Sequence, residues 1–440
     1  MNEQLQEKML KLFNTAYYLA VNERPISDFA SLCTLQIKNS VDLWDFYLND
    51  IQCKDLLESI SAEQHLTVKE TLNSKRPRFL SMMADGGTDV STKELELIYV
   101  RYLDQGSVVN KFLKVHELKD AMATGIISTI GEAIEQAGVN DWKQALVHMG
   151  TDGASVYTGR QNGVVTKLTQ EIPWLTGIHC VVHNLELAAL DALKTESALG
   201  EVKEMLKGIY KHYKYSPKAL REAREVASVL EEDFILPVNI LGTRWLPHMQ
   251  RALTALLRNY QAIIAHFNDT AADRKGSADM QGRATNIVRK LENLFTVGFI
   301  HLMLDFIEVL SKVSLLFQCN DITLAAAKDG LEVARLELKA MVARPACKFS
   351  VFLNAARLGQ SYKGVELRSR PDDLERLADK RRHLAANIEE YIDGRFESLV
   401  DNPVLSAAEI FDVKNWPQNN TELATYGEDP LTAPDAAKQL

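Results

Sequence analysis

The sequence predicts an α/β protein in which a mixed sheet precedes a long helical region. Short apolar runs rich in β-branched and aromatic residues fall between residues 79 and 115. Apolar runs and helix-like stretches then alternate as far as residue 178. From about residue 184 apolar side chains recur at helical spacing, with one short extended break. The chain is therefore expected to be rich in helix overall.

The first three strands are predicted to form a meander. Residues 79–84 are an apolar run that ends at Asp85, and residues 95–103 alternate as a half-buried strand does. A turn at 104–106 leads to a returning strand over 107–115.

Helices over 118–137 and 156–170 then alternate with strands over 145–149 and 175–178, and Asp152 lies just past the first of these strands. The order β-β-β-α-β-α-β-α predicts a mixed sheet with helices on both faces. It matches the ribonuclease H-like order, in which acids lie on the first and fourth strands. Periodicity alone does not distinguish this fold from other α/β folds.

The helical region sets the domain organisation. Its least regular stretch is residues 345–370. We predict a helical amino-terminal region (1–75), a ribonuclease H-like core (76–245), an all-helical insertion domain (246–402) and a polar tail (403–440).

Composition is that of a folded protein, with 46% hydrophobic and 25% charged residues. A net charge of −9 argues against nucleic-acid binding through bulk charge, so such binding needs a local basic face. Five scattered cysteines suit a reducing compartment better than a disulfide framework. We expect the chain in the nucleus, with the cytoplasm as the alternative.

No membrane association is expected. The amino terminus is polar, and the best candidate span, residues 299–317, is interrupted by Asp305, Glu308 and Lys312. This stretch is expected to be a buried helix. No small-molecule cofactor is expected either.

Asp85 and Asp152 are the candidate metal ligands. Two carboxylates at the ends of neighbouring central strands can share divalent metal ions for phosphoryl transfer. That chemistry normally needs a third carboxylate. Aspartates after strands are also common as turn formers and helix caps, so spacing alone leaves both interpretations open.

Cys180 and His183 form a Cys-x-x-His pair at a predicted strand–helix junction. They supply half of a zinc site at most, and no matching half lies nearby. His179 and His183 have the spacing of the zinc-protease pattern, but Cys180 stands where that pattern needs Glu. We favour a pair that is buried and satisfied by hydrogen bonds.

Two features are candidates for contacting nucleic acid. Arg244 and Trp245 precede a predicted helix, where Arg can grip a phosphate and Trp can stack on a base; helix capping and packing explain them equally well. Lys207, Lys211 and Lys214 recur at helical spacing with tyrosines between them. A solvated helix face is the usual meaning of such a run.

Together these motifs resemble the hAT superfamily of transposases and the host proteins derived from them, in particular the zinc-finger-862-like branch of animal proteins. The resemblance covers residues 85–248 and weakens toward both ends. The matching motifs are DGGTD (85–89), YVRY (99–102), TDGAS (151–155), QNGV (161–164), IHCVVH (178–183) with LELA (185–188), YSPK (215–218) and GTRW (242–245).

The resemblance implies a ribonuclease H-like core interrupted by a large helical insertion. In the family an Asp-Asp-Glu triad binds two Mg²⁺ or Mn²⁺ ions for strand cleavage and transfer. By position, Asp85 and Asp152 match the first two acids, and Cys180 and His183 match a motif thought to support the core. The Arg244-Trp245 pair matches one that contacts DNA, with the Trp against an extruded base.

The chain departs from the family in two respects. The third acid of the family is a Glu in a Ser-rich segment near the carboxyl end, and no such segment occurs before Leu440. The family's amino-terminal zinc finger and carboxyl-terminal dimerisation segment are also missing from these residues. The resemblance therefore predicts a truncated or decayed transposase-derived chain, inactive in strand transfer, that retains binding to DNA or to related hAT-like proteins.

Two alternatives stay open. The chain is an active metal-dependent transposase or nuclease if another chain, or a Glu within residues 184–440, places a carboxylate within about 5 Å of both aspartates. It is a protein-interaction scaffold if the helical region carries a contiguous exposed apolar patch and no basic groove.

Overall fold

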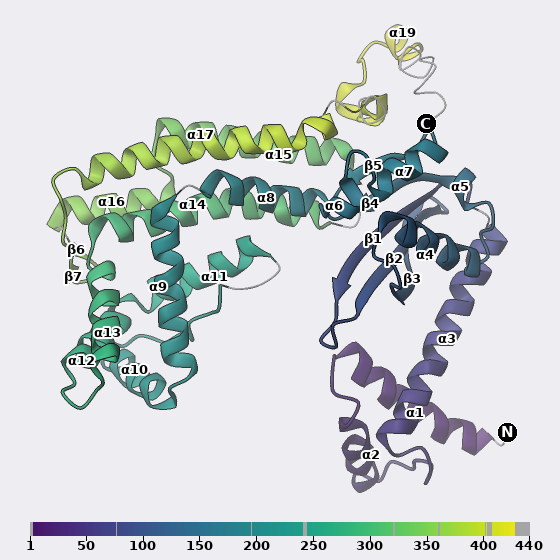
Figure 1. The fold of residues 1–440 in the computed structure, drawn as a ribbon, viewed down its shortest axis with the longest axis horizontal. Helices are drawn as coiled ribbons and strands as arrows, with labels where there is room; N and C mark the ends of the chain where they lie inside the picture. Colours follow the sequence, from purple (N-terminus) through teal and green to yellow (C-terminus); the bar gives the residue numbers. More distant parts are fainter. Residues whose placement is uncertain are drawn as a thin grey trace. The chain divides into compact units, whose positions relative to one another are not determined.

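The computed structural model describes residues 3–75, 77–194, 196–240, 244–319, 322–359, 361–400, 402 and 407–426. The chain forms two compact units, Met1–Ile178 and His179–Leu440, and each is described by itself (Figure 1). This division falls earlier than residue 245, where the sequence predicts the end of the core. The reason is that α8 (Val181–Leu193) packs against long helices of the second unit.

Three helices open the first unit: α1 (Glu3–Val21), α2 (Asp28–Lys38) and α3 (Asp50–Lys75). They enclose a small core of their own, to which Leu12 and Phe29 contribute fully buried side chains. The far end of α3 packs against the sheet, because Leu72 belongs to the second hydrophobic core of this unit.

A five-stranded mixed sheet follows, in the order β3-β2-β1-β4-β5. β2 pairs antiparallel with both β1 and β3, and β1 pairs parallel with β4. This arrangement, with a helix-rich remainder of the chain, confirms the predicted α/β ribonuclease H-like fold class. The strands are β1 (Leu80–Thr88), β2 (Glu94–Asp104), β3 (Ser107–Glu117), β4 (Leu146–Thr151) and β5 (Thr176–His179).

Short helices connect the later strands. The apolar stripe of α4, which includes Ile126, Ile130 and Ile134, is buried in the core of the sheet. The single helix predicted over 156–170 is instead two helices joined by a tight turn. The turn requires glycine at 163, since a Cβ there would lie 2.6 Å from the Gly159 backbone. The helices are α4 (Ala123–Gln136), α5 (Trp142–Ala145), α6 (Ser155–Thr158) and α7 (Val164–Glu171).

The second unit is built around α14 (Leu294–Phe317), and α15 and α17 run side by side next to it (Figure 1). Among the described helices, α14 alone is apolar and long enough to cross a membrane by length and composition, yet 78% of its most apolar window is buried. The other helices are α9 (Ser197–Lys214), α10 (Pro217–Val229), α11 (Trp245–Arg258), α12 (Tyr260–Ala272), α13 (Ala278–Leu291), α15 (Leu324–Ala343), α16 (Cys347–Gly359) and α17 (Asp373–Val400), with a hairpin of β6 (Ser361–Tyr362) and β7 (Val365–Glu366). The short turns η1 (Ala408–Phe411), η2 (Val413–Asn415) and α19 (Asn420–Leu423) follow.

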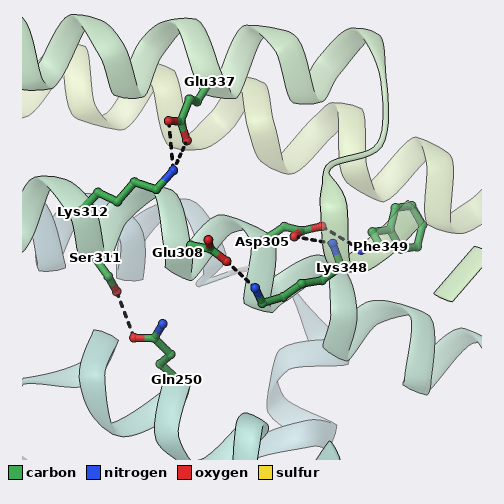
Figure 2. Close-up of polar contacts among 8 residues, drawn as sticks. All are labelled: Gln250, Asp305, Glu308, Ser311, Lys312, Glu337, Lys348 and Phe349. Atoms are coloured by element: carbon green, nitrogen blue, oxygen red, sulfur yellow. Dashed lines mark hydrogen bonds and ion pairs between the residues drawn. The ribbon is translucent and has the colours of Figure 1, made fainter. Parts of the chain in front are cut away.

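Residues 345–370, predicted to be irregular, contain the regular helix α16, and Asp305 of α14 accounts for it. The Asp305 carboxylate is 4% exposed and accepts hydrogen bonds from the backbone N–H groups of Lys348 (3.0 Å) and Phe349 (2.9 Å), as Figure 2 shows. The first N–H groups of a helix have no partner inside it. Asp305 therefore caps α16 from a distant part of the chain, a contact that local sequence patterns do not reveal.

We expect Asp305→Ala to lower the free energy of unfolding by about 2–4 kcal/mol, because it leaves two backbone N–H groups without an acceptor. The control is Glu308→Ala, which removes only a half-exposed ion pair with Lys348 and should change stability by less than about 1 kcal/mol. Urea denaturation measures both changes. Equal losses in the two variants would show that the cap is unimportant.

Candidate functional site

The parallel pairing of β1 and β4 brings the two predicted acids to one edge of the sheet. Ala84 and Thr151 are register partners, and Asp85 and Asp152 are the residues that follow them. β1 runs on to Thr88 instead of ending at Asp85, because β2 pairs with it throughout this stretch. The backbone N–H of Ala154 donates to Asp152 Oδ1 at 3.0 Å, which fixes the turn after β4.

A third acid, Glu96 of β2, lies beside this pair and was not among the predicted site residues. Its side chain is 0% exposed, and its register partner is Gly86, the residue after Asp85. The Tyr157 hydroxyl of α6 lies 2.7 Å from both carboxylate oxygens of Glu96 and donates its hydrogen bond to them. Gly86 leaves room for this contact, since a Cβ there would lie 3.2 Å from the Tyr157 oxygen.

The charges of the three acids are coupled. Burial raises the pKa of Glu96 to about 7; the Tyr157 hydrogen bond opposes this rise, and the negative charges of Asp85 and Asp152 add to it. Burial also raises the pKa of Tyr157, and its hydrogen bond to Glu96 raises it further. Tyr157 therefore remains a hydrogen-bond donor at neutral pH, and Glu96 exchanges a proton near neutrality.

The donor set can be compared with the metal centre that the resemblance implies. Asp85 and Asp152 carry oxygen ligands of the kind that Mg²⁺ and Mn²⁺ prefer. Both oxygens of Glu96, however, are engaged by Tyr157. In the part of the chain that the structure describes, no group of three or more His, Cys, Asp or Glu side chains is placed to hold a metal ion. These residues do not fit a two-metal centre in this conformation.

The Cys-x-x-His pair belongs to the second unit. Cys180 precedes α8 and His183 lies on its first turn; both are exposed, although the sequence favoured a buried pair. The reason is helical phase: the buried stripe of α8 begins with Val182 and Leu185, and His183 lies away from it. The ring centroids of His179 and His183 are 5.4 Å apart.

Arg244 and Trp245 lie at the start of α11, while Gly242 and Thr243 of the same motif lie outside the described residues. Trp245 is 9% exposed; its backbone N–H donates to the buried Glu186 at 2.9 Å, and the Lys203 ammonium lies 5.6 Å from its ring centroid. The exposed Arg244 donates to the Gln318 side chain. In this conformation Trp245 is a packing residue, and its predicted contact with a base remains a prediction.

The predicted lysine stripe lies on α9, and its members differ in their surroundings. Lys207 forms an ion pair with Glu204 at 2.8 Å. Lys211 and Lys214 are exposed, and among the described residues no carboxylate oxygen lies within 4.0 Å of either ammonium. The carboxyl-terminal end of α9 therefore presents two cations to solvent.

Comparison with known families agrees with this fold. Residues 34–163 match the model of the family DUF4371, described as the ZMYM1/FAM200, RNase-like domain. The matched region contains Asp85, Glu96, Asp152 and Tyr157. The match fits a hAT-derived, transposase-like protein. Together with the order of the sheet, it supports a transposon-derived, ribonuclease H-like domain.

The titration of Glu96 predicts how stability depends on pH. The pKa of Glu96 rises from 4.5 to about 7 on folding, so the protonated side chain stabilises the folded state. This stabilisation is fully present below pH 4.5 and is lost as pH rises through 7. Relative to wild type, Glu96→Gln should therefore gain about 2 kcal/mol of stability between about pH 5 and about pH 8.

Urea denaturation of both proteins at the two pH values measures this gain, and any constant effect of the substitution cancels in the comparison. A stability difference that is the same at both pH values would show that Glu96 titrates as an ordinary carboxyl.

Proposed function

We propose that the chain is a transposon-derived protein that binds DNA and does not cut it. The observation that supports this most concerns Glu96, an acid whose register partner is the residue after Asp85: it is buried and held through both oxygens by Tyr157. Loss of one carboxylate from a two-metal site should cost several kcal/mol of transition-state stabilisation, which is enough to abolish useful turnover.

The binding role is supported by cations of the second unit. With a net charge of −9, the chain can hold DNA only through a local basic surface. Lys211 and Lys214 on α9 and Arg244 before α11 are exposed. Lys207 contributes to the same helix face, although its ammonium forms an ion pair with Glu204.

The proposed family branch, cellular location and protein partners rest on the resemblance to hAT transposases. We place the chain in the zinc-finger-862-like branch and propose that it is nuclear and contacts related hAT-like proteins. Imaging of the tagged chain in cells tests its location, and affinity purification with a purified hAT-like protein tests the contact. Exclusion from the nucleus would contradict the first proposal, and the absence of a complex would contradict the second.

A second candidate function follows from the same site. Glu96 is close enough to Asp85 and Asp152 for its pKa to respond to both charges. Glu96 pairs with Gly86, so its side chain lies on the face of the sheet opposite to Asp85. The chain would be a metal-dependent nuclease if release from Tyr157 also let the Glu96 carboxylate reach round the end of the sheet to the two aspartates. The completing acid would then come from β2 instead of residues 184–440.

A cleavage assay separates the two functions. With millimolar Mn²⁺, wild-type protein should cut labelled DNA no faster than the Asp85→Ala and Asp152→Ala variants, while still shifting the same DNA in a gel. Metal-dependent cutting that is lost in Asp85→Ala and in Glu96→Gln would overturn the first function and establish the second. All three substitutions leave the basic residues of the second unit unchanged, so DNA binding serves as the internal control.

A further inference from the structure

Two hollows in the second unit share a basic lining. The first has a volume of about 490 Å³ and lies between α9 and α13, where Lys211, Arg283 and Lys290 line it. The second has a volume of about 540 Å³ and lies where α9, α14 and α17 begin. Its basic side chains are Arg289, Lys290, Arg370, Arg376 and Lys380. Because Lys290 lines both, the two hollows adjoin, and we call them together the α9 groove.

The carboxylates of the α9 groove leave part of this charge unmatched. Asp373 is 1% exposed and pairs with Arg376. Glu204 pairs with Lys207, which lines neither hollow, and Glu201 is an exposed carboxylate of the second hollow. Among the residues described, no carboxylate oxygen lies within 4.0 Å of a side-chain nitrogen of Lys211, Lys290 or Arg370. An anion can therefore engage these three cations without breaking an ion pair.

The dimensions of the α9 groove suit a single strand. It follows α9, whose 18 residues span about 27 Å, or up to roughly eight nucleotides at the spacing of about 3.4 Å per strand. Each hollow is of a size that takes a small molecule. A duplex presents convex backbones and is read by elements that protrude into its grooves, which a hollow does not do.

Aromatic side chains accompany the charges. Tyr215, 76% exposed, lines the first hollow. Phe295 lines the second, with the Arg376 guanidinium 4.4 Å from its ring centroid. A basic groove with aromatic rings on which bases stack is how proteins hold single strands without reading sequence. We propose that the α9 groove binds single-stranded DNA, an inference that rests on the DNA binding proposed above.

Fluorescence anisotropy with a labelled single strand of about eight nucleotides, and with the duplex of the same sequence, tests the proposal. Wild type should bind the single strand at least about tenfold more tightly than the duplex. A triple variant, Lys211→Gln with Lys290→Gln and Arg370→Gln, should lose about 100-fold or more, and the slope of log K against log salt should fall by about 2. Tyr215→Ala should lose about tenfold through stacking.

The matched control is Arg221→Gln with Arg224→Gln and Lys275→Gln, three exposed cations of the same unit that do not line the α9 groove. It has the same charge change and should stay within about threefold of wild type. Equal losses in both triple variants, or tighter binding of duplex, would overturn the groove proposal and leave DNA binding intact. No binding of either nucleic acid by wild type would overturn the proposed function and this inference with it.

Discussion

The parallel pairing of β1 with β4 is the constraint on which the acidic site depends. It joins two strands that are separated in the chain by a hairpin and α4, and it sets Asp85 beside Asp152 because their preceding residues, Ala84 and Thr151, are register partners. A shift of one residue along either strand would turn one aspartate to the other face of the sheet. The buried side chains of Met82 and Met149 oppose such a shift, because it would expose one of them. Packing of the core therefore fixes the positions of the Asp85 and Asp152 carboxylates.

Much of the sheet and the meeting of the two aspartates could be predicted, because apolar runs mark central strands and parallel neighbours end at one edge. Glu96 was missed although the sequence holds a signal for it. In β2 the buried positions are Glu96, Ile98, Val100 and Tyr102, so the glutamate occupies the apolar phase of an alternating strand. An acid in that phase needs a buried partner, but which residue supplies it depends on where the short helix α6 places Tyr157. The sequence predicts one helix over 156–170 and does not show that α6 is a separate element.

The second unit shows the limits of local patterns in the same way. α16 forms in a stretch without a convincing period because Asp305, remote in sequence, caps it and because Phe349 and Phe352 are buried. Trp245 resembles a DNA-contacting residue in sequence, yet it packs under Lys203 and against Glu186. The lysine spacing on α9 was visible, but the basic residues of α13 and α17 that adjoin it come from distant segments. Contacts between segments distant in sequence therefore determine the capping of α16, the packing of Trp245 and the basic lining next to α9.

The chain combines two units. In the described residues of its ribonuclease H-like domain no three His, Cys, Asp or Glu side chains are placed to hold a metal ion, and its helical unit has two hollows with a basic lining. In the proposed function, the hydrogen bond from Tyr157 keeps Glu96 from acting as a metal ligand. Isothermal titration of Mn²⁺ into the purified chain, beside the Asp85→Ala and Asp152→Ala variants, tests this most directly. We expect wild type to bind Mn²⁺ at one weak site at most, of about millimolar strength, and both variants to lose it. Two ions bound at micromolar strength, with a loss in Glu96→Gln as well, would contradict it.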